Sequence, residues 1–488
     1  MSSRSTLAML GSWVALSAMW TLAAPAMAAE PVDEAVEQLV LEAEAANLEL
    51  AGAGQGVAQR LAILDQARAR FLPALDLGMR YSMADGGRQI DVPVGDLLNP
   101  VYASLNSLLA ASGQPAPFTP IDNVSIPFLR EEELQATASL TQPLYDARLP
   151  AARRAAEYQY LASRQGLDAL RVRLRRDVQQ AWFRWLATRE SAAILEASLE
   201  AARENQRVNE SLHRNGRVTR DLVLRAEADV LEIEQQLEAT KGAQRIARNY
   251  VNLLRNQPLE APLPEATVSD ADVTRRRDAL VRQAGSVARD RGWLQETAVE
   301  RRYELRQIDS GIQAAGAAED LARAAFKPQL AFAVDAGVQS EDLGFAGDEN
   351  FVLASLVLRF NLFNGGADRA ALREARARTG QLLATRDLAE QQVRLEVLEA
   401  AKDFEVAEAS LRTAAKRVEA ADGAFDIARR KRDLGQIAQV EFIDARRALT
   451  SAQLNQQVNR FQALSALAAV EYAVGGPVRS APPPETGP

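Results

Sequence analysis

The sequence predicts a mostly helical protein built from two copies of one helix–strand–strand–helix–helix unit. A nine-residue phrase, A-x-x-x-F-x-P-x-L, occurs at 67–75 and again at 322–330, an offset of 255 residues. Two further landmarks follow each copy in the same order, an aromatic phrase at an offset of 218 residues and a glycine-led turn at 219. Internal repeats of this kind indicate the architecture of a chain before any local signal does.

The landmarks also locate an insertion in the first copy. The aromatic phrase reads QPLYD at 142–146 and FNLFN at 360–364, and the turns contain Gly216 and Gly435. The offset falls by 37 residues between the first landmark and the second, so the first copy carries additional residues between its two strands. This strand-to-strand insertion, 83–126, mixes apolar and turn residues, which predicts an ordered lid or a simple surface decoration.

Four segments alternate apolar and polar side chains with the two-residue period of a β-strand. Each is about ten residues long, which is the length of a tilted strand that spans a membrane. Four strands of a soluble sandwich would show the same alternation. The strands are predicted at about 73–82, 132–144, 328–339 and 350–362.

The remaining sequence predicts long helices. Residues 33–70 read as one helix that leads into the first strand, and helical hairpins are predicted at 148–256 and 367–474. The second helix of each hairpin has apolar residues spaced alternately by four and three, which is typical of a coiled-coil seam. In the first copy the seam includes Ala226, Val230, Ile233 and Leu237.

The ends of the chain and the segment between the copies complete the predicted domains. An apolar stretch after Arg4 ends at Ala26-Met27-Ala28, which is typical of a cleaved secretory signal. The predicted domains are the signal peptide 1–28, the first repeat 29–256, an inter-repeat linker and equatorial segment 257–298, the second repeat 299–476 and a disordered tail 477–488.

Composition excludes several classes of function. The chain has no cysteine and a single histidine, His213, so most catalytic triads and histidine-rich zinc sites are excluded, and we expect no enzyme activity, metal or cofactor. His213 lies in the last turn of a predicted helix, where a cation is favoured. The net charge of −8 argues against nucleic-acid binding. Beyond the signal no run approaches 18 apolar residues, so we expect any membrane span to consist of strands.

Four strands cannot close into a cylinder by themselves. An open sheet edge in lipid leaves backbone groups unpaired at several kcal/mol each, and bacterial barrels start at about eight strands. If the strands lie in a membrane, several copies of the chain must therefore combine their strands.

With these repeated phrases and glycine-led turns, the chain resembles the TolC family of outer-membrane efflux proteins over about residues 33–476. The resemblance implies a homotrimer in the cell outer membrane, in which three chains close a twelve-stranded barrel. It also implies a long α-helical coiled-coil barrel that spans the periplasm.

The resemblance further implies the function. The chain would be the exit duct of a tripartite efflux or type I secretion system, which passively exports small molecules or drugs. Its partners would be its own copies, outer-membrane lipid, a periplasmic adaptor (a membrane fusion protein) and an inner-membrane pump of the RND or ABC type. The resemblance does not specify which substrate is exported. The alternative is a soluble periplasmic coiled-coil adaptor, or a structural protein of an export complex.

Family members close the periplasmic mouth with charged and polar residues at the two helix turns. The second turn of the family carries carboxylates six and nine residues after its glycine, and these positions are Glu441 and Asp444. Where the family can carry a tyrosine this chain has Arg432, which we expect to pair with a carboxylate. Three copies of Glu441 and Asp444 would form a ring of like charges, although both could be ordinary acids at a helix start.

The first turn matches the family less closely. The position six residues after Gly216 is Leu222, and the neighbouring polar residues are Asp221 and Thr219. We include these two in the predicted aperture. The resemblance also implies that the glycines of the two turns, Gly216 and Gly435, lie at the tips that contact the adaptor.

Overall fold

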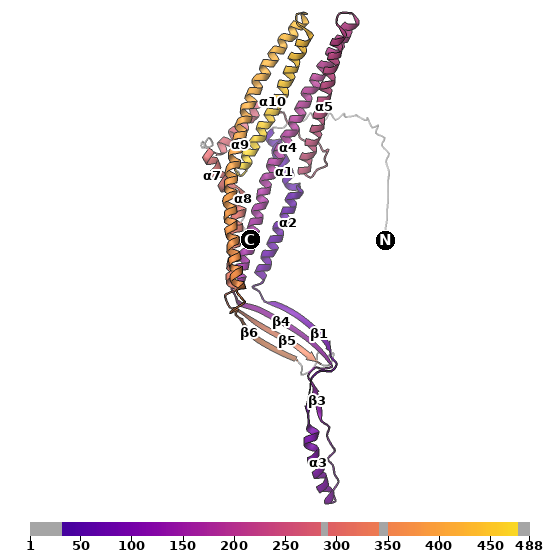
Figure 1. The fold of residues 1–488 in the computed structure, drawn as a ribbon, viewed down its shortest axis with the longest axis vertical. Helices are drawn as coiled ribbons and strands as arrows, with labels where there is room; N and C mark the ends of the chain where they lie inside the picture. The colour runs from indigo at the N-terminus through magenta and orange to yellow at the C-terminus, as the bar shows by residue number, and fades with distance from the viewer. Residues whose placement is uncertain (1–31, 285–290, 341–349, 477–488) are drawn as a thin grey trace, which may run out of the picture. The chain divides into compact units, whose positions relative to one another are not determined.

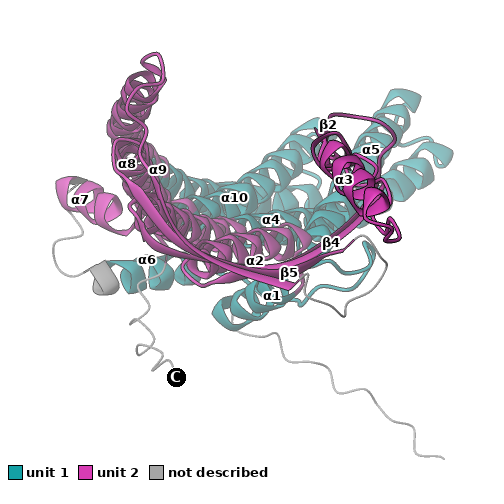
Figure 2. Cartoon of the chain, turned by 90° about the horizontal axis from the view of Figure 1, so that it is seen from below, with its two compact units in different colours: residues 1–45, 177–282, 404–468 teal, residues 46–176, 283–403, 469–488 magenta. Residues whose placement is uncertain are grey.

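The structure is a computed structural model that describes residues 32–284, 291–340 and 350–476 (Figure 1). The predicted signal peptide and disordered tail lie outside these residues. The chain divides into two compact units, coloured in Figure 2. Unit 1 comprises 1–45, 177–282 and 404–468, and unit 2 comprises 46–176, 283–403 and 469–488.

Unit 2 contains a four-stranded antiparallel sheet within the described residues, in the order β1-β4-β5-β6. The register places Leu77 opposite Ala138, Ala138 opposite Ala336, and Ala336 opposite Val352. Because side chains alternate between the two faces of a strand, these residues share one face with further apolar residues of all four strands, whereas Leu353 and Val357 of β6 lie on the other face. The strands are β1 (Ala74–Met83), β4 (Glu132–Asp146), β5 (Gln329–Ser340) and β6 (Asn350–Arg359).

The insertion between β1 and β4 has a structure of its own. Two short strands, β2 (Gln89–Val92) and β3 (Val124–Pro127), form an antiparallel hairpin, and the helix α3 (Val94–Ala111) lies between them in the chain (Figure 1). The sequence predicted an ordered insertion but no helix. The 18 residues of α3 are thus an addition to the predicted architecture.

The two repeats contain helices of equal length. Helices α4 (Arg148–Arg214) and α9 (Ala367–Asp433) each have 67 residues. The helices that follow them, α5 (Arg220–Leu254) and α10 (Gln439–Ala473), each have 35. The equal helix lengths show that the duplication found in the sequence is also present in the structure.

The prediction of one helix over 33–70 is wrong, because Asn47 separates α1 (Val32–Ala46) from α2 (Leu48–Ala69). Asn47 has extended backbone angles (φ −63°, ψ 126°), and its side chain accepts a hydrogen bond from the Leu50 N–H at 2.9 Å. This is the geometry of a helix N-cap, which asparagine favours. The cap starts a new helix where the apolar pattern is continuous.

The second repeat has the same break 255 residues later. Arg302 separates α7 (Arg291–Arg301) from α8 (Tyr303–Ala324), with φ −61° and ψ 121°. Its guanidinium is buried and donates to Glu304 at 3.0 Å and to Glu396 of α9 at 2.9 Å. The remaining helix, α6 (Asp270–Ala284), lies in the predicted linker.

The core of unit 1 holds the helices of the hairpins together. A cluster of buried apolar residues joins α4 to α5, and Leu454 of α10 packs against it. Among the described helices, none is long and apolar enough to span a membrane. The residues of the cluster are Ala192, Leu195, Leu199, Ala202, Val230, Ile233 and Leu237.

Candidate functional site

The apolar face of the sheet is open to its surroundings. On β1, Leu75, Leu77 and Met79 are 72%, 83% and 67% exposed, and on β6 Val352 and Leu356 are 77% and 65% exposed. A soluble sandwich would cover such a face with a second sheet. Contiguous exposed apolar surface of this kind marks a contact with lipid or protein, and here it forms a band of strand residues.

The opposite face of the sheet is mainly polar on β1, β4 and β5, and on β6 it also carries Leu353 and Val357. The Arg80 guanidinium donates to the Gln135 side chain at 3.2 Å, and the Ser139 hydroxyl donates to Asp335 at 2.6 Å. These pairs cross from strand to strand on the face opposite the apolar band. The sheet therefore has one apolar face suited to lipid and one face on which three of the four strands are mainly polar.

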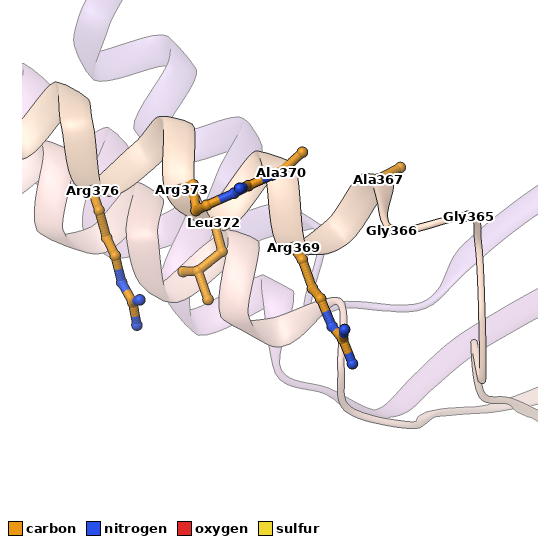
Figure 3. A pocket seen from close by; sticks show the side chains of 8 residues that line it. All are labelled: Gly365, Gly366, Ala367, Arg369, Ala370, Leu372, Arg373 and Arg376. Carbon is orange, nitrogen blue, oxygen red and sulfur yellow. The ribbon is translucent and has the colours of Figure 1, made fainter.

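Aromatic and basic residues gather where β6 passes into α9. Phe360 and Phe363 are 52% and 85% exposed. The first turns of α9 form an open groove with Arg369, Arg373 and Arg376 on its wall (Figure 3). Exposed aromatic rings beside arginine side chains are typical of the boundary between a membrane and water.

The two turns between paired helices have the same geometry. In the first, the Gly216 N–H donates to the His213 carbonyl at 2.9 Å and the Arg217 N–H to the Leu212 carbonyl at 2.9 Å. Gly216 has a φ of 67° and Gly435, in the second turn, a φ of 69°. This is the Schellman end of a helix, which requires a left-handed residue and so favours glycine.

His213 takes part in the first turn. Its Nδ1 lies 3.0 Å from the Val218 carbonyl oxygen, so the imidazole bridges the end of α4 and the turn. This contact gives the single histidine of the chain a structural role. Among the described residues, no group of acidic, histidine or cysteine side chains is arranged to hold a metal ion.

The predicted aperture residues of the second turn are exposed. Glu441 and Asp444 lie in the first turns of α10, and both side chains are accessible to solvent. Arg432 pairs with a carboxylate, that of Asp433 at 3.1 Å, and its guanidinium lies 4.2 Å from the centre of the Phe442 ring. Arg432 thus fastens the end of α9 to the start of α10.

The predicted aperture residues of the first turn contact each other. Thr219 is the N-cap residue of α5, and its hydroxyl donates to the Asp221 carboxylate. Asp221 also lies 3.9 Å from Arg225, one helical turn further along. Both residues are exposed, so their side chains are accessible at this tip.

Sequence reasoning missed a buried ion pair near the two turns. Asp229 of α5 pairs with Arg446 and, at 2.9 Å, with Arg447 of α10. Asp229 and Arg446 are only 1% and 5% exposed. The hydrogen bond to Asp229 raises the pKa of Arg447 above its usual range. The pair ties the returning helix of one repeat to that of the other.

A signal for this pair was present in the sequence. Asp229 directly precedes the seam residue Val230, so it flanks the coiled-coil seam. Arg446 directly follows Ala445 and lies three residues before Leu449, so it flanks the seam of the second copy. Opposite charges that flank two coiled-coil seams pair when the seams meet, so their presence favours that contact.

A second polar contact joins the first hairpin to α10. The Gln439 side-chain amide donates to the Asn205 side chain of α4. Asn209, one turn along α4, donates to the Asn205 carbonyl at 2.8 Å. The Gln439 contact favours this arrangement of the helices, because it supplies a donor to the buried side-chain oxygen of Asn205.

The chain is similar to known proteins over most of its length. A sequence model described as outer membrane efflux protein matches residues 39–256 and 294–476. The toluene efflux pump outer membrane protein TtgC of Pseudomonas putida is 24% identical over 319 residues, which make up 65% of this chain and 63% of TtgC. The protein CyaE of Bordetella pertussis is 32% identical over 173 residues, 35% of this chain and 36% of CyaE.

Solved structures share the fold. The outer membrane protein VceC from Vibrio cholerae superposes with a TM-score of 0.70 at 17% identity, covering 90% of this chain and 96% of VceC. The Campylobacter jejuni CmeC outer membrane channel gives a TM-score of 0.72 at 15% identity, covering 96% of this chain and 94% of CmeC.

Proposed function

The chain belongs to the outer membrane efflux protein family, and we propose that it is the trimeric exit duct of a tripartite export system in the cell outer membrane. In this proposal the sheet lies in the outer membrane and the helices extend into the periplasm. Solutes pass through a water-filled lumen by diffusion, and the duct itself performs no chemical step.

The observation that carries the proposal is the combination of an open sheet with an uncovered apolar face. The edges of the sheet are β1 and β6, and in lipid each needs a hydrogen-bonding partner. Pairing β1 of one copy with β6 of the next, three times over, satisfies every edge and turns the apolar bands outward. The opposite face, with Arg80 and Asp335, then lines the lumen.

We further propose that the two helix turns form the periplasmic aperture. Glu441 and Asp444 of three copies would form an acidic ring, with Asp221 and Thr219 contributed by the first turn. Like charges around one axis attract cations and resist anions. Arg432 would position this ring through its contacts with Asp433 and Phe442.

The relatives support small molecules or drugs as the substrate class. TtgC is named for toluene efflux, and a further relative, ArpC of Pseudomonas putida, for antibiotic efflux. We propose that this chain likewise receives its substrates from an inner-membrane pump through a periplasmic adaptor. The adaptor would contact the tips at Gly216 and Gly435.

Conductance across a planar lipid bilayer tests the proposal. Purified protein added to one side should insert and produce discrete current steps that favour cations over anions. A variant in which the sequences of β1 (74–83) and β4 (132–146) are scrambled should produce no current steps. Absence of current steps from the intact protein, under conditions in which it enters the bilayer, would contradict the duct.

A further inference from the structure

The helix α3 carries two parallel stripes of residues, of which the first is hydrogen-bonded to the rest of the insertion and the second is apolar and exposed. The first stripe is Gly95, Asn99, Tyr102 and Asn106, and the second is Leu98, Val101, Leu105 and Leu108. Within each stripe, neighbours are three or four residues apart. This is the spacing of one helix face, so each stripe can contact a different partner.

The first stripe holds the returning segment 118–123 against the helix. Asn99 exchanges two hydrogen bonds with the backbone of Ile121, at 2.9 and 2.8 Å, and Asn106 exchanges two with Phe118, at 2.6 and 3.2 Å. The rings of Tyr102 and Phe118 lie 5.1 Å apart. Any side chain at Gly95 would meet the Ile121 carbonyl oxygen, so the contact is close.

These contacts make α3 a rigid element. Side-chain amides that satisfy both the N–H and the C=O of an opposing residue hold it much as a sheet ladder would. The Asp96 N–H and carboxylate bind the Asn123 side chain in the same reciprocal way, at 3.1 and 3.0 Å. The second stripe is therefore presented in a fixed orientation.

The second stripe is apolar and exposed. Leu98, Val101, Leu105 and Leu108 are 38%, 51%, 40% and 67% exposed, and their spacing of three, four and three is that of a coiled-coil seam. Such a stripe on a rigid helix marks a protein contact. Helices that bind anionic membrane surfaces carry lysine and arginine on the polar side, whereas the one charged residue of α3 is Asp96.

We propose that this stripe is a contact between copies of the chain, so that in the trimer the three α3 helices associate through Leu98, Val101, Leu105 and Leu108 and narrow the outer opening. The inference rests on the proposed trimer. The insertion leaves the sheet at the end of β1, an edge strand. In the proposed trimer β1 pairs with β6 of the next subunit, which places the start of the insertion at the subunit boundary.

Single cysteines test the contact cleanly, because the natural chain has none. Leu105→Cys places a thiol on the exposed stripe. Ala103→Cys is the matched control, since two residues correspond to about 200° around a helix and Ala103 is also exposed. Mild oxidation of the purified full-length trimer should link two of its three chains through Cys at 105, at least about fivefold more than at 103.

The yield should be independent of protein concentration, because the link forms within one trimer. Equal linkage at 105 and 103, no linkage, or linkage that rises with concentration would overturn the proposal. As a second readout, Leu98→Glu with Leu105→Glu should increase single-channel conductance, while Ala103→Glu should not. Failure of the duct itself would appear differently, as loss of the trimer and of conductance in the unmodified chain.

Discussion

Asp229 of α5 and Arg446 of α10 form an ion pair in which both residues are almost fully buried, at 1% and 5% exposure. The two residues belong to different repeats, so the pair joins the two helical hairpins of one chain inside unit 1. Arg447 extends it, because its guanidinium contacts both Asp229 at 2.9 Å and Glu232 at 3.0 Å.

Removing one partner of this pair should destabilise the hairpins. Asp229→Ala leaves Arg446 buried without its counter-ion, which typically costs roughly 3–5 kcal/mol. We expect a clear fall in the midpoint of thermal unfolding, followed by the helical circular dichroism signal. The double variant Asp229→Leu with Arg446→Met should recover much of the loss, because it removes both buried charges.

Arg225→Ala is the control for that measurement. Arg225 pairs with Asp221 at 3.9 Å, and both side chains are 62% exposed. An exposed pair contributes only about 0–1 kcal/mol, so the midpoint should hardly move. If Asp229→Ala costs no more than Arg225→Ala, the buried pair does not hold the hairpins together.

The acidic residues of the second turn should control block by divalent cations. Replacing both Glu441 and Asp444 by Ala removes the proposed ring of like charges, and the half-blocking concentration should rise about tenfold or more, equivalent to about 1.4 kcal/mol. The measurement is single-channel current against divalent concentration. Glu419→Ala is the control, since Glu419 lies on α9 and pairs with Lys416 at 2.7 Å. Unchanged block by divalent cations in the double variant would show that these acids do not line the aperture.

The turn glycines should be required for their backbone conformation. Gly435 has a φ of 69° and no atom near the position of a Cβ, so Gly435→Ala should cost about 1–2 kcal/mol through strain alone. Asparagine should be tolerated better, as Asn256 adopts a φ of 51° at the end of α5. The midpoint of thermal unfolding should be highest with glycine at position 435, lower with asparagine and lowest with alanine.

A glycine inside a helix should behave in the opposite way. Gly423 lies within α9 and also has open space around it. Gly423→Ala should therefore stabilise the protein by about 0.5–1 kcal/mol. A loss of stability at 423 equal to that at 435 would mean that side-chain bulk, and not backbone conformation, explains both.

One carboxylate of unit 2 should make stability depend on pH. Glu390 of α9 binds Arg394 at 2.9 Å and also Arg386, and these contacts lower its pKa below 4.5. The arginines in turn contact Glu296 of α7 at 2.7 Å and Asp309 of α8 at 3.4 Å. A lowered folded-state pKa means that the stabilisation is fully present above pH 4.5 and is lost as pH falls through the folded-state value.

The comparison of wild type with Glu390→Gln isolates this contribution. The wild type should unfold at the higher temperature at pH 7, and the difference should shrink as the pH is lowered below 4.5. Thermal midpoints measured from pH 7 to pH 3 give the difference directly. A difference that is constant over this range would show that Glu390 does not titrate through its ion pairs.

The sheet was the most predictable part of the fold, because its two-residue period is written directly in the side chains from Leu75 to Tyr81. The helix breaks were not predicted. Neither Asn47 nor Arg302 is a glycine or proline, and the apolar pattern continues across both. The two breaks are separated by the repeat offset of 255 residues. Once one break is known, this offset gives the position of the other.

The family resemblance located Glu441 and Asp444 by their distance from Gly435, and their place in an aperture stays a prediction. The pairing of Asp229 with Arg446 was not predicted, because it depends on which helices meet in three dimensions. The helix α3 was missed because Pro100 and the flanking turn residues hide the spacing of Leu98, Val101 and Leu105. Long-range contacts between repeats are the information that local patterns lack.

The central claim is that copies of the chain share one wall, and the mass of the intact complex tests it most directly. Native mass spectrometry of protein extracted from outer membranes in mild detergent counts the chains in each particle. We expect a single species of three chains that dissociates to monomers on heating. A stable, folded particle of one chain with its strands in the detergent micelle would contradict it.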